Sequence, residues 1–126
     1  MADTSKRKVL VVDDSKSAVM ILKNILNGSN YEIVRHVQTG EEAVLAYEEL
    51  KPDLVTMDLI LPGISGIDTI RQIIAKDPQA QIIVISSVVG IPHKLTLSLE
   101  AGAKNIVAKP LEPSKVISAF DKIFIG

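Results

Sequence analysis

Short apolar blocks rich in β-branched residues recur along the chain at intervals of about 22 to 28 residues, and this repetition restricts the fold more than any other feature. Each block has three to five residues, and most show no alternation with polar residues. The blocks are Val9–Val12, Ile33–Val37, Leu54–Met57, Ile82–Ile85 and Ile106–Ala108. Uninterrupted apolarity means burial on both faces, which is typical of strands in a parallel sheet. The pattern therefore predicts five buried parallel strands.

The segments between the blocks carry apolar residues at helical spacing. The expected stripes are Val19, Leu22 and Leu26; Ala43, Tyr47 and Leu50; Ile67, Ile70 and Ile74; Leu95 and Leu99; and Val116, Phe120 and Ile123. Helix starts are indicated by Ser15, Thr39 and Ser65 as N-caps and by Pro92 and Pro113 in first turns; Gly28 and Gly102 indicate two helix ends. Strands and helices thus alternate five times, which predicts a three-layer α/β sandwich.

Length and composition exclude several other classes of protein. A chain of 126 residues fits one domain spanning residues 1–126, with residues 1–7 as a flexible N-terminus. The 14 basic and 15 acidic residues balance, which argues against a nucleic-acid binder. The absence of Cys excludes a disulfide scaffold, a thiolate metal site and a cysteine nucleophile. No apolar run is long enough to enter a membrane or to form a signal peptide, so we expect a cytoplasmic protein.

Polar residues follow four of the five predicted strands directly. They are Asp13 and Asp14, Asp58, Ser86 and Ser87, and Lys109 with Pro110. Because ligands bind at the carboxyl ends of strands in an open parallel sheet, we expect these side chains to meet at one edge. The second block, which contains His36, has no such residue after it, which indicates a strand at the border of the sheet. We interpret His36 and His93 as surface residues.

Three converging carboxylates repel one another strongly. At ~4 Å and an effective dielectric constant near 20, each pair costs about 4 kcal/mol, and Lys109 can neutralise only one of the three. A site made of oxygen ligands with room for water suits Mg²⁺ or Mn²⁺, and the missing Cys argues against Zn²⁺. A divalent ion beside a free carboxylate indicates phosphate chemistry, with the carboxylate as the nucleophile.

At these positions the sequence resembles the response-regulator receiver domain of two-component signalling, from Lys8 to Phe124. The matching segments are V-L-V-V-D-D-S, V-T-M-D-L-I-L-P-G-I-S-G, I-V-I-S-S and A-G-A-K-N-I-V-A-K-P, in this order. The resemblance implies a flavodoxin-like, doubly wound (βα)5 fold whose five-stranded parallel sheet has the order 2-1-3-4-5. It also implies a phospho-acceptor that catalyses its own phosphorylation and dephosphorylation, and not an enzyme acting on other molecules.

The resemblance assigns the acidic residues to phosphorylation and to metal binding. Asp58 is implied to take a phosphoryl group from the phosphohistidine of a sensor histidine kinase. Asp14 and Asp58 are implied to bind Mg²⁺ directly, Asp13 through water, and Ile60 through its backbone carbonyl.

Further residues are implied to respond to the phosphoryl group. Lys109 pairs with its oxygens, Ser86 donates a hydrogen bond to it and pulls the following loop inward, and Ser87 contributes its backbone. The family commonly has a cis peptide before the proline that corresponds to Pro110. These changes are implied to alter the surface formed by the fourth helix, the fifth strand and the fifth helix, where a downstream protein binds. The first helix and the loop after Lys109 are implied to face the kinase.

Two features depart from the family pattern, and two further residues bear on dephosphorylation. Ile106 occupies the position of an aromatic switch residue, so a loop shift with aliphatic repacking must report phosphorylation. The connection over residues 87–92 is about one residue longer than is common, which leaves Ser87 as an alternative to Ser86 for the active hydroxyl. Ile60 and Val88 carry no polar group that could orient an attacking water. We therefore predict slow self-dephosphorylation.

Several functions remain open from the sequence. The first is a stand-alone regulator in chemotaxis or a phosphorelay, as a monomer unless it dimerises through the same surface. The second is the receiver fragment of a longer transcriptional regulator. The third is a metal-dependent aspartyl-phosphate phosphatase, although such folds have an Asp-x-Asp pattern after the first strand and a cap insertion, and this chain has Asp13-Asp14-Ser15. A flavodoxin-like FMN binder is disfavoured because no aromatic residue lies near the predicted site.

Overall fold

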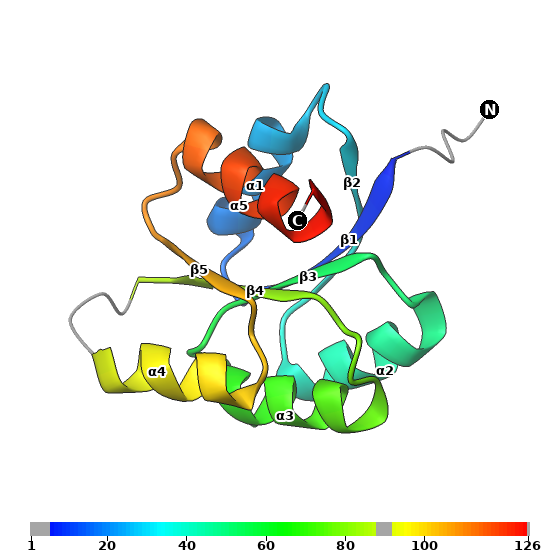
Figure 1. The fold of residues 1–126 in the computed structure, drawn as a ribbon, viewed down its shortest axis with the longest axis vertical. Coiled ribbons are helices and arrows are strands. Elements are labelled where there is room, and N and C mark those ends of the chain that lie inside the picture. The colour runs from blue at the N-terminus through cyan, green and yellow to red at the C-terminus, as the bar shows by residue number, and fades with distance from the viewer. Residues whose placement is uncertain (1–5, 88–91, 126) are drawn as a thin grey trace.

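The structure, a computed structural model, describes residues 6–87 and 92–125 and places a five-stranded parallel sheet between two layers of helices (Figure 1). The elements are β1 (Arg7–Val12), α1 (Lys16–Leu26), β2 (Tyr31–Val37), α2 (Gly40–Leu50), β3 (Leu54–Met57), α3 (Gly66–Lys76), β4 (Ile82–Ser86), α4 (Pro92–Ala101), β5 (Asn105–Ala108) and α5 (Pro113–Ile125). The strand order is β2-β1-β3-β4-β5, and every neighbouring pair is parallel. This confirms the expected doubly wound fold, with β2 at one border.

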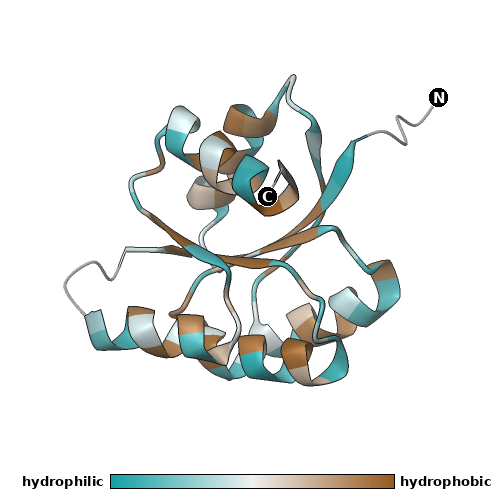
Figure 2. Cartoon of the chain, in the orientation of Figure 1, coloured by the Kyte–Doolittle hydropathy of each residue, from teal (hydrophilic) through white to brown (hydrophobic). Residues whose placement is uncertain are grey.

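The strands occupy the predicted apolar blocks, some lengthened at one end. All residues of β3 and β4 are buried, as are the last four of β1, because helices cover both faces of the sheet. In Figure 2 the apolar colour runs along the strands and along the sides of the helices that face them. The sheet therefore forms the middle of the core and provides a rigid base for the side chains that follow its strand ends.

Each face of the sheet has its own apolar cluster. One cluster lies under α2, α3 and α4 and includes Leu10, Met57 and Ile70. The other lies under α1 and α5 and includes Val11 and Phe120. Burial of each large side chain contributes about 1.5 to 3 kcal/mol relative to exposure, so the two layers hold the sheet edge in place.

Two predicted N-caps lie next to the carboxyl edge of the sheet. The hydroxyl of Ser15 accepts a hydrogen bond from the N–H of Ala18 at 3.3 Å, which begins α1 directly after the first strand end. The hydroxyl of Ser65 accepts one from the N–H of Asp68 at 3.1 Å, which begins α3. Thr39 caps α2 in the same way, and Pro92 and Pro113 are the first residues of α4 and α5. These caps fix where the chain turns beside the site.

The predicted stripe on α4 is wrong in one position. Leu99 is 46% exposed, whereas Ser98 is fully buried. Leu95 packs on the core, and Ser98, three residues later, shares its face. The hydroxyl of Ser98 donates a hydrogen bond to the carbonyl of Leu95 at 2.7 Å. This polar side chain can therefore occupy the buried position that was expected for Leu99.

Some sequence expectations fall on residues outside the described ranges. These include residues 1–5 of the expected flexible N-terminus and the connection containing Val88. Arg7 already belongs to β1, where its N–H donates to the carbonyl of Asn30 at 2.8 Å. Within residues 6–87 and 92–125, none of the helices combines the length and the apolarity needed to cross a bilayer.

Candidate functional site

Three carboxylates meet at the carboxyl edge of the sheet. One oxygen from each of Asp13, Asp14 and Asp58 lies within 4.8 Å of the other two, as the sequence predicted. Val12 and Met57 are register partners in neighbouring strands, so the residues that follow them are placed side by side. The N–H of Asp58 also donates to the carbonyl of Val12 at 2.9 Å, which continues the ladder into the site.

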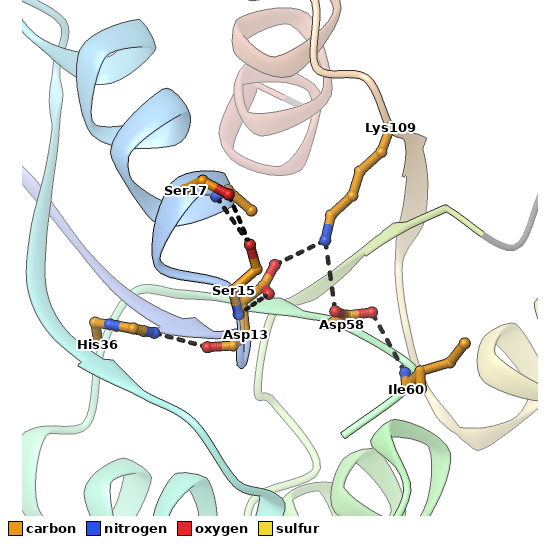
Figure 3. A network of polar contacts seen from close by, with 8 residues as sticks. Asp13, Ser15, Ser17, His36, Asp58, Ile60 and Lys109 are labelled. Atoms are coloured by element: carbon orange, nitrogen blue, oxygen red, sulfur yellow. Dashed lines mark hydrogen bonds and ion pairs between the residues drawn. The ribbon is translucent and has the colours of Figure 1, made fainter. Parts of the chain in front are cut away.

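Lys109 joins two of these carboxylates (Figure 3). Its Nζ lies 2.9 Å from Oδ2 of Asp13 and 3.4 Å from Oδ2 of Asp58. Lys109 follows β5, and its side chain reaches past the intervening β4. The Lys109–Pro110 peptide is cis, as the family resemblance implied. Its single positive charge is shared by two carboxylates, because Asp13 and Asp58 lie next to each other.

The ammonium does not balance the charge of the cluster. Asp13 is 5% exposed and Asp58 is 8% exposed, so both carboxylates have lost most of their hydration. The pKa of Asp58 is raised, mainly by burial and further by repulsion from Asp13. The charge of Lys109 and the N–H of Ile60, which donates to Asp58 Oδ1 at 3.3 Å, lower this pKa but do not cancel the increase. The three carboxylates and one ammonium leave a formal excess of two negative charges.

The pKa of Lys109 also moves upward, although burial alone would lower it. The hydrogen bond that Lys109 donates to Asp13 and the charges of both carboxylates outweigh the loss of hydration. The raised pKa of Lys109 favours its charged form. The raised pKa of Asp58 disfavours its charged form, because one ammonium is shared between two acids. Lys109 therefore stays protonated, and Asp58 is the group whose charge is poorly compensated.

Asp13 is held by contacts on all of its polar atoms. Its N–H donates to the carbonyl of Val37 at 3.1 Å, and its Oδ1 accepts from the N–H of Ser15 at 2.9 Å. Its carbonyl oxygen lies 2.7 Å from Nε2 of His36. The interpretation of His36 as a surface residue is therefore wrong, since its ring is half-buried and contacts the backbone of the cluster. His93 is exposed, as expected.

The remaining predicted residues lie around this cluster. Ser86, the last residue of β4, is 2% exposed, and its carbonyl accepts from the N–H of Lys109 at 2.9 Å. Ser87 follows it and is exposed. Ile60 is 53% exposed. Ile106 on β5 packs against the apolar core cluster under α2, α3 and α4.

Gly66, the last residue of the segment V-T-M-D-L-I-L-P-G-I-S-G, lies against the backbone of the site. Its N–H donates to the carbonyl of Leu59 at 3.0 Å, which brings the start of α3 against the backbone of Asp58. A Cβ at Gly66 would overlap the carbonyl oxygen of Asp58 and lie 2.6 Å from Cα of Leu59. Only a residue without a side chain permits this approach, so Gly66 supports the position of Asp58.

We expect Gly66→Ala to lower the free energy of unfolding by about 2 kcal/mol, because the added methyl group displaces backbone in a tightly packed place. Urea denaturation measures this change. Gly28→Ala is the matched control: Gly28 has φ of 79° but open space around it, so it carries only the backbone cost of about 1 kcal/mol. Equal losses for the two variants would contradict the steric explanation.

The donor set fits a hard divalent cation. All three side chains offer carboxylate oxygens, which Mg²⁺ prefers, and Asp14 is exposed, which gives waters access to the cluster. Among residues 6–87 and 92–125, the ion pairs of these carboxylates all come from Lys109, so the excess negative charge is not compensated by a second described cation. Within the part of the chain that the structure describes, this is also the single group of three or more potential metal-ligating side chains.

Comparisons with known proteins agree with this arrangement. A family model described as the response regulator receiver domain matches residues 9–121. The chain is 43% identical over 117 residues to a chemotaxis protein CheY from Thermotoga maritima, covering 93% of this chain and 97% of that protein. It is 34% identical to the DNA-binding response regulator MtrA from Mycolicibacterium smegmatis, covering 92% of this chain and 50% of that protein.

A solved structure adds a likeness at the level of the fold. The CheX–CheY–BeF3–Mg²⁺ complex from Borrelia burgdorferi contains a chain that is 33% identical and superposes with a TM-score of 0.89. The match covers 95% of this chain and 90% of that one.

Proposed function

Since the chain belongs to the response regulator receiver domain family, we propose that it is a single-domain response regulator that accepts a phosphoryl group on Asp58 from a sensor histidine kinase. The observation that carries the proposal is the poorly compensated carboxylate of Asp58 between Lys109 and two further acids. We place the protein in the cytoplasm. Its similarity to CheY proteins supports a role in chemotaxis-like signalling.

The residues would share the transfer as follows. A carboxylate oxygen of Asp58 attacks phosphorus and forms the P–O bond of an acyl phosphate. The P–N bond of the kinase phosphohistidine breaks, and its electron pair returns to the imidazole. Asp13, Asp14 and Asp58 would hold Mg²⁺ (or Mn²⁺), with the carbonyl of Ile60 as a further ligand. When bound, this ion neutralises charge on the phosphoryl oxygens.

Lys109 would exchange one partner during this step. Before transfer it contacts both Asp13 and Asp58, and the new phosphoryl oxygens carry more negative charge than the carboxylate they replace. The ammonium would therefore pair with the phosphoryl group. Ser86, at the neighbouring strand end, would donate a hydrogen bond to the same group, with Ser87 contributing its backbone.

We assign the output to the surface formed by α4, β5 and α5. An open groove of about 580 Å³ runs along β5 and α5, and its lining includes Asn105, Ile106, Ser114, Lys115, Ser118 and Lys122. Ile106 connects this groove to the core, so aliphatic repacking there can transmit a shift of the loop after Ser86. A downstream protein would bind here, while the chain acts as a monomer and not as an enzyme on other substrates.

We assign the kinase contact to the surface beside Lys109 and Pro110. A small apolar hollow of about 130 Å³ is lined by Ala18, Ile21, Lys109, Pro110 and Leu111. Ile21 and its neighbour Met20 are 50% and 58% exposed on α1. This combination of exposed apolar side chains with the site lysine supports docking of the sensor kinase here.

The proposal is tested by incubating the protein with acetyl phosphate and Mg²⁺ and then measuring its intact mass. We expect one phosphoryl group on the wild type, none on Asp58→Asn, and one on Asp68→Asn, a control at an exposed aspartate of α3. An unmodified wild type would contradict the proposal. Rapid hydrolysis of excess donor without an adduct would instead indicate the phosphatase function.

We predict that Ile60→Asn accelerates loss of the phosphoryl group several-fold. Ile60 lies two residues after Asp58 with half of its surface in solvent, so an amide there could orient the attacking water. The measurement is the decay of the phosphorylated mass after donor removal. Leu45→Asn changes an equally apolar, 69% exposed residue on α2 and should leave the decay unchanged. If Ile60→Asn loses the phosphoryl group as slowly as the wild type, the absence of a polar side chain at position 60 is not the reason for slow dephosphorylation.

A further inference from the structure

His36 contacts the backbone of the acidic cluster from the border strand β2 (Figure 3). Its Nε2 lies 2.7 Å from the carbonyl oxygen of Asp13. A carbonyl oxygen can only accept a hydrogen bond, so Nε2 must carry a proton. The contact therefore defines which nitrogen of the neutral ring is protonated.

The pairing between β1 and β2 loses register once. Val9 pairs with Ile33, but Leu10 pairs with Arg35, so Val34 is skipped. An extra residue of this kind changes which side of the sheet the following side chains face.

The skipped residue places the side chain of His36 on the α1 side of the sheet. Ile33 packs with the cluster under α1 and α5, and strict alternation would place Val37 on the same side. Val37 instead belongs to the cluster under α2, α3 and α4. His36, its neighbour, consequently shares the α1 side with its register partner Val11, which is the side where the β1–α1 turn begins.

The carbonyl that His36 contacts belongs to the peptide between Asp13 and Asp14. The other polar atoms of Asp13 are already engaged by Val37, Ser15 and Lys109. The carboxylate of Asp14 has no hydrogen bond among the contacts of the described residues, so its direction depends on its backbone. Holding this peptide plane thus orients both carboxylates of the turn.

We propose that His36 is a positioning residue for the divalent-cation site: its Nε2–H holds the Asp13–Asp14 peptide so that both carboxylates face Asp58. This inference rests on the proposed function, because it concerns how the same site is built. His36 does not touch the cation. It acts through a hydrogen bond to the residue next to a ligand, in the way that outer-shell partners maintain metal sites.

The test compares two substitutions of His36. His36→Phe keeps a ring without a donor, whereas His36→Gln offers an amide N–H at about the distance of Nε2. We expect His36→Phe to weaken Mg²⁺ binding about tenfold and His36→Gln to stay within about twofold of the wild type. The adduct formed from acetyl phosphate at saturating Mg²⁺ should be unchanged in both. Mg²⁺ affinity is followed by titration of the backbone amide resonances of Asp13 and Asp14.

The second histidine of the chain provides the matched control. His93 is exposed on α4, so His93→Phe should bind Mg²⁺ as the wild type does. The proposal is overturned if His36→Phe keeps wild-type Mg²⁺ affinity, or if His36→Gln loses as much affinity as His36→Phe.

A measurement on the wild type tests the contact without any substitution. The ring nitrogen resonances of His36 in alkaline solution should show the proton on Nε2, and a proton on Nδ1 would overturn the proposal even if His36→Phe fails to fold. A wild type that neither binds Mg²⁺ nor forms an adduct would overturn the proposed function. A wild type that does both, together with an unaffected His36→Phe, would remove only the role of His36.

Discussion

Lys109→Met is expected to lower the free energy of unfolding by about 3 kcal/mol at neutral pH in the absence of Mg²⁺, because it leaves two buried carboxylates without their shared cation. The pKa of Lys109 is raised in the folded protein despite its burial, since Asp13 and Asp58 outweigh the lost hydration. Its contribution is therefore fully present below the pKa that it has in the unfolded chain. That contribution disappears only as the pH rises through the higher folded pKa, in strongly alkaline solution.

Urea denaturation with and without Mg²⁺ measures this effect. Saturating Mg²⁺ should recover more stability in Lys109→Met than in the wild type, because the ion then supplies the missing positive charge. Lys115→Met is the control: Lys115 is 72% exposed and pairs with Glu112 at 3.4 Å, so we expect a change within about 1 kcal/mol. Similar losses in the two variants would show that Lys109 does not compensate the cluster.

Asp58→Asn is expected to abolish the phosphoryl adduct and at the same time to raise the free energy of unfolding by about 1 to 3 kcal/mol at neutral pH. The substitution removes the nucleophile but keeps the shape of the side chain. It also removes a buried charge whose pKa is raised by burial and by Asp13. Because the folded pKa lies above the unfolded one, Asp58 costs stability as the pH rises through the folded pKa, and it costs none below the unfolded pKa.

The difference in stability between Asp58→Asn and the wild type should accordingly shrink in acid. Denaturation at several pH values, without Mg²⁺, measures it. Asp14→Asn is the comparison: Asp14 is exposed, so its loss should weaken Mg²⁺ binding with a smaller gain in stability. The double variant Lys109→Met with Asp58→Asn should be more stable than the sum of the single effects predicts. A destabilised Asp58→Asn would show instead that this carboxylate has a mainly structural role.

The fold was largely predictable because its strongest signal is local. Continuous apolar blocks such as Ile82–Ile85 mark strands buried on both faces, and Ser15 and Ser65 mark helix starts that the structure retains. The order of the strands came from the family resemblance, since periodicity does not determine which strands are neighbours. The stripe on α4 failed at Leu99 because a short, weakly amphipathic helix allows two similar phases, and packing of Leu95 decided between them.

The convergence of the acids in the site was also predictable, because residues that follow parallel strands share an edge. The contact of His36 was not, since it depends on one skipped residue, Val34, and an irregular register leaves no local mark in the sequence. The close approach of Gly66 likewise depends on how α3 packs. A glycine one position before the helical stripe that begins at Ile67 gives no indication of its distance to Asp58.

The contacts of Lys109 with Asp13 and Asp58 form only when the sheet is complete. Its partners lie 96 and 51 residues earlier in the chain, at Asp13 and Asp58. These residues meet only after β1, β3 and β5 have joined one sheet, the last of them near the carboxyl terminus. A polypeptide in which β5 has not yet joined the sheet consequently lacks the cation that bridges Asp13 and Asp58, so the charge compensation of the site requires the complete sheet.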